Sequence, residues 1–214
     1  MRAKHEAFTL VEMLVVLAVL GILVGLLLPA ILAARENARI AGCLSNLKQL
    51  GQAIDLYMSD YDRTYPFGLD PVLRADIHDD GGKTWSRDFI DRWLAMPDLR
   101  DLLRPYGASP EVWRCPSHKA WSILPGQLPP RDVYVTYGTS YNYDPWLPAL
   151  GARETLFPDP ANSYLMADYD PHRGTNKYDW MKNELFADFH VKMMSYPALL
   201  DTDDAFNYVH TRGR

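Results

Sequence analysis

The sequence predicts an α+β protein in which one long N-terminal helix packs on a small antiparallel β-sheet. Three observations support this fold class. An unbroken apolar run covers residues 13–28, and apolar residues then recur at every third or fourth position as far as Tyr61. Short stretches of strand-forming residues follow, separated by Pro and Gly. The 214 residues leave room for one domain of ordinary size beyond the helix.

Three interpretations of the apolar segment compete: a cleaved secretory signal, a plain membrane anchor, and an anchor that later becomes a filament core. A secretory signal needs a small-x-small cleavage site after the apolar run, and residues 32–34 are a poor version of one. Residues 8–34 are long enough to cross a hydrocarbon core of about 30 Å at about 1.5 Å per helical residue. Glu12 disfavours a plain anchor, because a carboxylate in a membrane helix costs about 3 kcal/mol and therefore indicates a function.

The start of this segment, Phe8-Thr9-Leu10-Val11-Glu12-Met13-Leu14-Val15-Val16, resembles the N-terminal signature of type IV pilins and type II secretion pseudopilins. In that family a prepilin peptidase cuts immediately before the Phe, methylates the new N-terminus and leaves the helix on the mature protein. The resemblance implies cleavage between Ala7 and Phe8, with Ala7 standing where the family usually has Gly. It also implies that the new Phe8 ammonium pairs with Glu12 of a neighbouring subunit during assembly. Pro29 falls where many pilins carry a proline.

The resemblance also implies boundaries, location and partners. Residues 1–7 are the leader, 8–34 the transmembrane and filament-core helix, 35–61 its amphipathic second half, and 62–214 a globular extracytoplasmic domain. The protein is expected to cross the inner membrane once with its N-terminus in the cytoplasm. This orientation comes from the resemblance, because basic residues lie on both sides of the span and the positive-inside rule does not decide it. The expected partners are prepilin peptidase, other pilin or pseudopilin subunits, the inner-membrane assembly platform and membrane lipid.

Later motifs resemble prepilin-type proteins of the planctomycete kind, whose domain is often described by an H-x9-DG motif. The matching stretches lie on the predicted helix and at three places in the domain: residues 39–54 with Tyr57, Tyr61 and Tyr65-Pro66, then Arg114-Cys115-Pro116-Ser117, Gly138-Thr139-Ser140-Tyr141, and residues 185–191. The chain departs from the motif itself. Phe189 stands where a Gly is expected after Asp188, and His172 lies farther upstream of Asp188 than the motif's spacing.

In the domain, three runs have strand character: residues 133–137, 163–167 and 184–194. Residues 97–103 predict a short helix, and residues 70–85 predict a long loop. The six Trp and thirteen Tyr residues are compatible with sugar or peptide binding. Aromatic side chains also fill the cores of small α+β domains, and we favour that interpretation.

Cys43 and Cys115 are the only two cysteines. Outside the cytoplasm a disulfide between them would tie the helix to the domain and restrict the unfolded chain. A pair of buried thiols would serve packing equally well, so the sequence leaves both states open. Two cysteines are too few for a thiolate zinc site.

Six acidic and histidine residues form the richest polar cluster in the sequence: Asp168, Asp170, His172, Asp179, Asp188 and His190. Oxygen ligands suit calcium, which some major pseudopilins bind near the C-terminus, so Asp168, Asp188 and His190 are the candidate ligands. Their spacing matches no specific metal loop, and a solvated acidic surface is the favoured interpretation, as it is for Asp201, Asp203 and Asp204. No other cofactor is expected.

Charge and motifs narrow the function further. A net charge of −5 disfavours nucleic acid as a partner, because phosphate binding needs a basic face. The sequence has no nucleophile elbow, zinc-protease helix or phosphate loop, so we do not expect an enzyme. The sequence thus indicates a structural filament subunit, with a pseudopilin of a type II secretion-like system as the main hypothesis. The alternatives are a true type IV pilus subunit and a membrane-tethered binding protein that does not polymerise.

Overall fold

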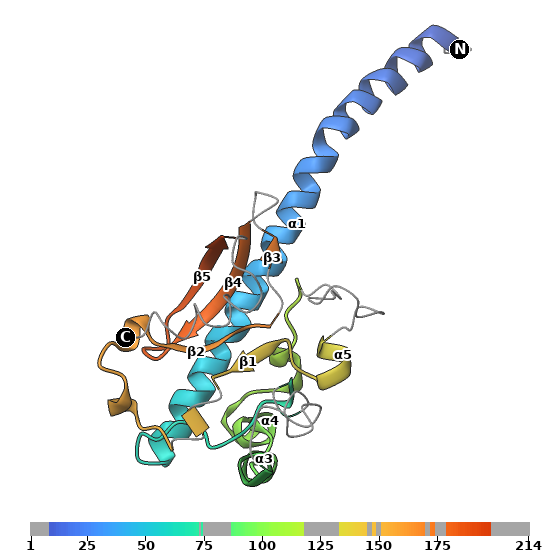
Figure 1. The fold of residues 1–214 in the computed structure, drawn as a ribbon. Coiled ribbons are helices and arrows are strands. Elements are labelled where there is room, and N and C mark those ends of the chain that lie inside the picture. Colours follow the sequence, from blue (N-terminus) through green and yellow to red (C-terminus); the bar gives the residue numbers. More distant parts are fainter. Residues whose placement is uncertain are drawn as a thin grey trace, which may run out of the picture. The chain divides into compact units, whose positions relative to one another are not determined.

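The computed structural model describes residues 9–72, 74, 87–117, 133–144, 147–148, 151–169, 172–173 and 179–197. The chain forms two compact units, Met1–Arg39 and Ile40–Arg214. The helix α1 (Leu10–Asp60) contributes its first part to one unit and its second part to the other (Figure 1).

In the first unit, α1 is an apolar helix whose side chains are all exposed from Leu10 to Arg35. The backbone is helical on both sides of Pro29. Among the described residues, α1 is the one helix long and apolar enough to cross a membrane. Such a surface is stable in lipid or against other helices, because apolar area exposed to water is unfavourable at roughly 25 cal/mol per Å².

In the second unit, α1 buries one face, and the predicted amphipathic pattern is confirmed. Cys43, Leu47, Leu50 and Ile54 are completely buried at steps of three or four residues, which places them on one side of the helix. Tyr61 differs from the prediction. It follows the last helical residue and is 52% exposed, and its ring stacks on Tyr57 with 4.2 Å between ring centroids.

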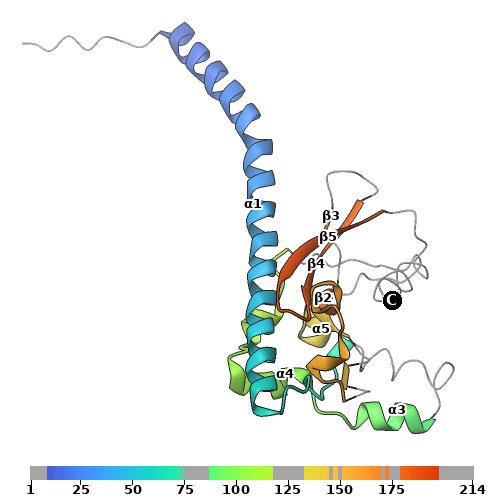
Figure 2. The ribbon, with the colours of Figure 1, turned by 90° about the vertical axis from the view of Figure 1, so that its left-hand side faces the viewer.

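The sheet is antiparallel throughout, as predicted. It contains β1 (Tyr141–Tyr143), β2 (Tyr164–Asp168), β3 (His172–Arg173), β4 (Asp179–Phe186) and β5 (Val191–Pro197), in the order β1-β2-β4-β3 with β5 also paired to β4. Figure 2 shows β4 and β5 beside the helix. A Cβ at Gly51 of α1 would lie 2.8 Å from the Cδ1 atom of Leu185, so a glycine there lets the sheet approach closely.

The predicted strand over residues 163–167 is confirmed as β2, but the run over residues 184–194 is a hairpin rather than one strand. Its turn is closed by the Phe186 amide, which donates to the His190 carbonyl at 3.0 Å. Phe189 sits in this turn with a φ of 63°. That backbone conformation costs a side-chain-bearing residue about 1–2 kcal/mol, which explains why the motif expects a Gly at this position.

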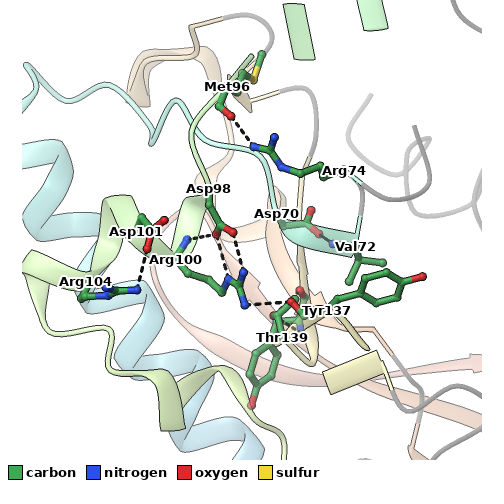
Figure 3. A network of polar contacts seen from close by, with 11 residues as sticks. Asp70, Val72, Arg74, Met96, Asp98, Arg100, Asp101, Arg104, Tyr137 and Thr139 are labelled. Carbon is green, nitrogen blue, oxygen red and sulfur yellow. Dashed lines mark hydrogen bonds and ion pairs between the residues drawn. The ribbon is translucent and has the colours of Figure 1, made fainter. Parts of the chain in front are cut away.

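The predicted strand over residues 133–137 is wrong, because these residues form the short helix α5 (Val133–Tyr137). Its C-terminal end is fixed by residues outside the run. Gly138, with a φ of 75°, donates its amide to the Tyr134 carbonyl at 2.7 Å and ends the helix in the left-handed conformation. Arg100 donates to the Tyr137 carbonyl at 3.0 Å (Figure 3), and a strand preference read from local sequence misses both contacts.

The other helices are short: α3 (Arg87–Leu94), α4 (Leu99–Leu103), and the 3-10 helices η1 (Arg104–Tyr106), η2 (Pro110–Trp113), η3 (Glu154–Leu156) and η4 (Pro160–Asn162). The predicted helix over residues 97–103 is confirmed as α4, whose N-cap Asp98 accepts the Arg100 amide. In the predicted loop over residues 70–85, residues 71, 72 and 74 are helical, and residues 73 and 75–85 lie outside the described residues.

The aromatic side chains mainly form the core, as favoured above. The completely buried large residues include Trp113, Tyr65, Tyr141 and Tyr143. They pack with the buried face of α1 and with Leu165, Met166 and Leu185 of the sheet in one cluster. Tyr61 and Phe67 are among the exposed exceptions.

A substitution at Gly138 tests the packing around Arg100. A Cβ at Gly138 would collide with the Arg100 guanidinium, which is held by Asp98 at 2.7 Å (Figure 3). We expect Gly138→Ala to lower the free energy of unfolding by about 3 kcal/mol, from backbone strain and the displaced hydrogen bond. Gly151 is the matched control, because it also has a positive φ but open space around it. Chemical denaturation should show a loss of only about 1–2 kcal/mol for Gly151→Ala; equal losses would contradict the role of Arg100.

Candidate assembly site

The first turn of α1 contains a reciprocal pair of hydrogen bonds between Thr9 and Glu12. The Glu12 carboxylate accepts the Thr9 amide at 2.8 Å and the Thr9 hydroxyl at 2.6 Å, while the Glu12 amide donates to the Thr9 hydroxyl oxygen at 3.3 Å. This is a capping box, in which residues three apart satisfy the unpaired donors at a helix start. The negative charge also lies at the positive end of the helix dipole, where it is favourable.

Glu12 is thus bound within its own chain, and its side chain is exposed. It is the one acidic residue in the first turn of α1 and precedes the apolar run. The predicted cleavage residues Ala7 and Phe8 lie outside the described residues. The capping box itself was readable from the sequence, since Thr9-x-x-Glu12 before an apolar run is its known pattern.

A second cluster joins α1 to the globular part of its own unit. Cys43 and Cys115 form a disulfide, with 4.7 Å between their Cα atoms. One helical turn after Cys43, the side-chain amide of Asn46 donates to the Arg114 carbonyl at 2.7 Å. At Gly42, the residue before Cys43, a Cβ would lie 3.1 Å from the Cγ atom of Pro116. Gly42, Cys43 and Asn46 therefore contact three consecutive residues, which gives a physical reason for the two sequence motifs that contain them.

A third group connects the end of α1 to the segment around η3. Arg63 donates to both carboxylate oxygens of Glu154 at 2.8 Å and to Asp55 at 2.7 Å. No local sequence pattern indicates this group, because 91 positions separate Arg63 from Glu154. All three side chains are substantially exposed, so we assign the network a modest structural role.

Two comparisons with known proteins bear on this arrangement. The model of the prokaryotic N-terminal methylation motif matches residues 2–28, which include Thr9 and Glu12. The model described as protein of unknown function (DUF1559) matches residues 32–145, more than half of the chain, and includes the Cys43–Cys115 cluster. The chain is a pilin-like member of the DUF1559 family.

Curated relatives match part of this DUF1559 protein. Type II secretion system core protein G of Pseudomonas aeruginosa is 29% identical over 90 residues, which cover 41% of this chain and 63% of the relative. The same protein of Escherichia coli K12 is 34% identical over 104 residues, covering 41% and 71%. Competence protein ComGC of Halalkalibacterium halodurans is 39% identical over 71 residues, covering 33% and 69%. The chain thus spans less than two thirds of the Pseudomonas relative, and no solved structure matches it.

The candidate calcium ligands do not form one site in the described part of this DUF1559 protein. Asp168 is buried in β2, whereas Asp188 and His190 lie at the β4–β5 turn, where they contact each other at 2.5 Å. The side chains of His172 and Asp179 and the residues Asp170, Asp201, Asp203 and Asp204 lie outside what is described. Among the described residues, the one group of three donors with metal-ligand spacing is Cys43, Cys115 and Asp168, which is not an oxygen set for calcium.

Glu184 of β4 gives this DUF1559 protein a pH-dependent stability. Burial, with a smaller contribution from Asp168, raises the pKa of Glu184 from 4.5 to about 7, and Lys182 opposes the shift. The folded state therefore holds a proton that the unfolded state has lost between these values. The contribution of Glu184 to the free energy of unfolding should be fully present below pH 4.5 and fall by up to about 3 kcal/mol as the pH rises through 7. Chemical denaturation at several pH values should show no such fall for Glu184→Gln. The control variant Glu111→Gln, at an exposed glutamate, should show the same fall as the wild type.

Proposed function

We propose that this protein is a pilin-like filament subunit that is cut before Phe8 and assembles through its N-terminal helix. The observation that carries the proposal is the capped Glu12 at the start of an exposed apolar helix, inside the matched methylation motif. In a membrane anchor this carboxylate would cap the helix, but its charge would be costly in lipid. In a subunit interface a neighbouring amine can neutralise that charge.

The Glu12 carboxylate has two alternative partners, one in the free subunit and one in the filament. In the free subunit Glu12 accepts hydrogen bonds from Thr9 of its own chain. In the filament the Phe8 ammonium of a neighbouring chain replaces them. A buried charge is tolerated when paired and strongly unfavourable when it has no partner. The exchange would therefore fix the axial register of neighbouring helices as they bundle.

The curated relatives favour a pseudopilin of a type II secretion-like system. Two of them are core protein G of that system, from Pseudomonas aeruginosa and Escherichia coli. The competence protein ComGC supports a second candidate, a true type IV pilus subunit for DNA uptake. In both cases the protein is a structural subunit and not an enzyme.

The proposal includes a location and partners. Residues 8–34 cross the inner membrane before assembly, with the N-terminus in the cytoplasm and residues 62–214 outside it. The apolar surface of the first part of α1 then exchanges lipid for other subunits. Prepilin peptidase and the inner-membrane assembly platform are the partners that this route requires.

Shearing of cells tests the proposal. The full-length chain is produced in a host with a type II secretion-like assembly system, with and without its prepilin peptidase. We expect the protein in sheared filaments only when the peptidase is present, and in the membrane fraction otherwise. Protein that stays in the membrane fraction in both hosts would contradict assembly and favour the membrane-tethered binding protein.

A further inference from the structure

Two arginines follow the apolar segment of α1 directly. The 22 residues from Met13 to Ala34 carry no charged or polar side chain, and Arg35 and Arg39 are the first basic residues after them. At about 1.5 Å per residue this segment is about 33 Å long, close to the hydrocarbon thickness of a bilayer, about 30 Å. In the membrane location proposed above, both guanidinium groups therefore reach the level of the lipid headgroups.

Both arginine side chains are accessible to a partner outside the chain. Arg35 is exposed, and the part of the chain that the structure describes gives it no ion pair or hydrogen bond. Arg39 is 55% exposed, and its contact with Glu36 is long, at 3.4 Å. An ion pair this exposed contributes little. Because Glu36 brings one negative charge against two positive ones, this turn of the helix keeps a net positive charge.

The two arginines lie on one side of α1. Residues four apart in a helix are about one turn apart, with about 5–6 Å between their Cβ atoms. Each guanidinium presents its donors in a planar fork that matches the oxygens of a phosphate group. Two such forks on one helix face suit a phosphodiester, and the adjoining apolar segment suits the acyl chains of the same molecule.

We propose that Arg35 and Arg39 bind the phosphate of an anionic phospholipid in the outer leaflet of the inner membrane. This inference rests on the membrane location in the proposed function and adds a lipid class to it. Basic residues close to an anionic membrane surface strengthen binding to that surface. The bound lipid also gives a reason for two arginines on the translocated side of the span, where the positive-inside rule disfavours them. It fixes the depth of the unassembled subunit in the bilayer.

Lipid selectivity of the full-length protein tests the proposal. The protein is purified in detergent and mixed with equal amounts of phosphatidylglycerol and phosphatidylcholine of the same chain length. Native mass spectrometry then gives the ratio of the two bound lipids. We expect the wild type to prefer phosphatidylglycerol, and Arg35→Gln/Arg39→Gln to lower the ratio by at least about tenfold. Arg2 and Lys4 are present in every sample, so the difference reports the arginine pair.

Two further variants separate position from charge. Arg92→Gln/Lys192→Gln removes the same charge from exposed side chains of the second unit and should keep the wild-type ratio. Arg35→Lys/Arg39→Lys keeps both charges on α1 and should keep a preference for phosphatidylglycerol. A loss in either variant as large as that of the Arg35→Gln/Arg39→Gln chain overturns the proposal.

The behaviour of the wild type distinguishes this proposal from the one on which it rests. Wild-type protein that binds both lipids equally well overturns the phosphate site and leaves the membrane location standing. Wild-type protein that binds neither lipid overturns the membrane location as well. Retention of phosphatidylglycerol by Arg35→Gln/Arg39→Gln at the wild-type ratio also overturns the proposal.

Discussion

A chain carrying Glu12→Ala is expected to insert into the membrane as well as the wild type and to be absent from filaments. The substitution removes the helix cap but also a carboxylate that costs about 3 kcal/mol in lipid, so insertion should not suffer. It also removes the group that would pair with the Phe8 ammonium of the next subunit, and an unpaired buried ammonium is strongly unfavourable. Quantitative immunoblots of membrane and sheared fractions should show a loss of at least about tenfold in the sheared fraction only, equivalent to about 1.4 kcal/mol.

Glu12→Gln is the matched control, because it separates charge from helix capping. A glutamine at this position can still accept the hydrogen bonds from Thr9, whose amide and hydroxyl now bind the carboxylate. If the intermolecular charge pair drives assembly, Glu12→Gln fails to enter filaments as Glu12→Ala does. If Glu12→Gln assembles normally, Glu12 acts by capping the helix, and the proposed pairing is wrong.

Replacing both cysteines by alanine is expected to lower the free energy of unfolding of the second unit by about 4 kcal/mol. The disulfide joins residues 72 positions apart, and a cross-link over a loop of that length removes much of the entropy of the unfolded chain. Alanine is preferred to serine because both positions are buried and a buried hydroxyl would add its own cost. Chemical denaturation followed by Trp fluorescence, with the buried Trp113 as a reporter, measures the loss.

Wild-type protein reduced with dithiothreitol is the control for the cysteine variant. Both should lose stability by a similar amount, since both lack the cross-link. A loss below about 1 kcal/mol in both samples would show that the contacts of Gly42 and Asn46 hold α1 in place without the disulfide.

The sequence predicted those parts of the fold that depend on local pattern. The recurrence of apolar residues at every third or fourth position as far as Tyr61 predicted the buried face of α1, and residues 97–103 were predicted as the short helix observed as α4. Residues 133–137 were misassigned because Arg100 and Gly138 fix that helix from outside the run. The hairpin at β4 and β5 was missed because its turn carries Phe189, which is not a residue typical of turns.

The contacts of the candidate site likewise include local ones, which the sequence indicates, and long-range ones, which it does not. Glu12 stood out in the sequence as a charge in an apolar segment, and its pairing with Thr9 spans only three residues. The hydrogen bond of Asn46 to Arg114 and the disulfide between Cys43 and Cys115 join residues far apart in the chain. No local spacing predicts them, because they arise when the globular part packs against the helix.

Mass spectrometry of the N-terminus of the mature protein tests the central claim most directly. The full-length chain is produced with and without a prepilin peptidase, and Ala7→Gly restores the family's usual residue before the cut. We expect a chain that begins with methylated Phe8 when the peptidase is present, with at least as large a cleaved fraction in Ala7→Gly. A chain that keeps Met1 in the presence of the peptidase, or that begins after Ala34, would contradict it.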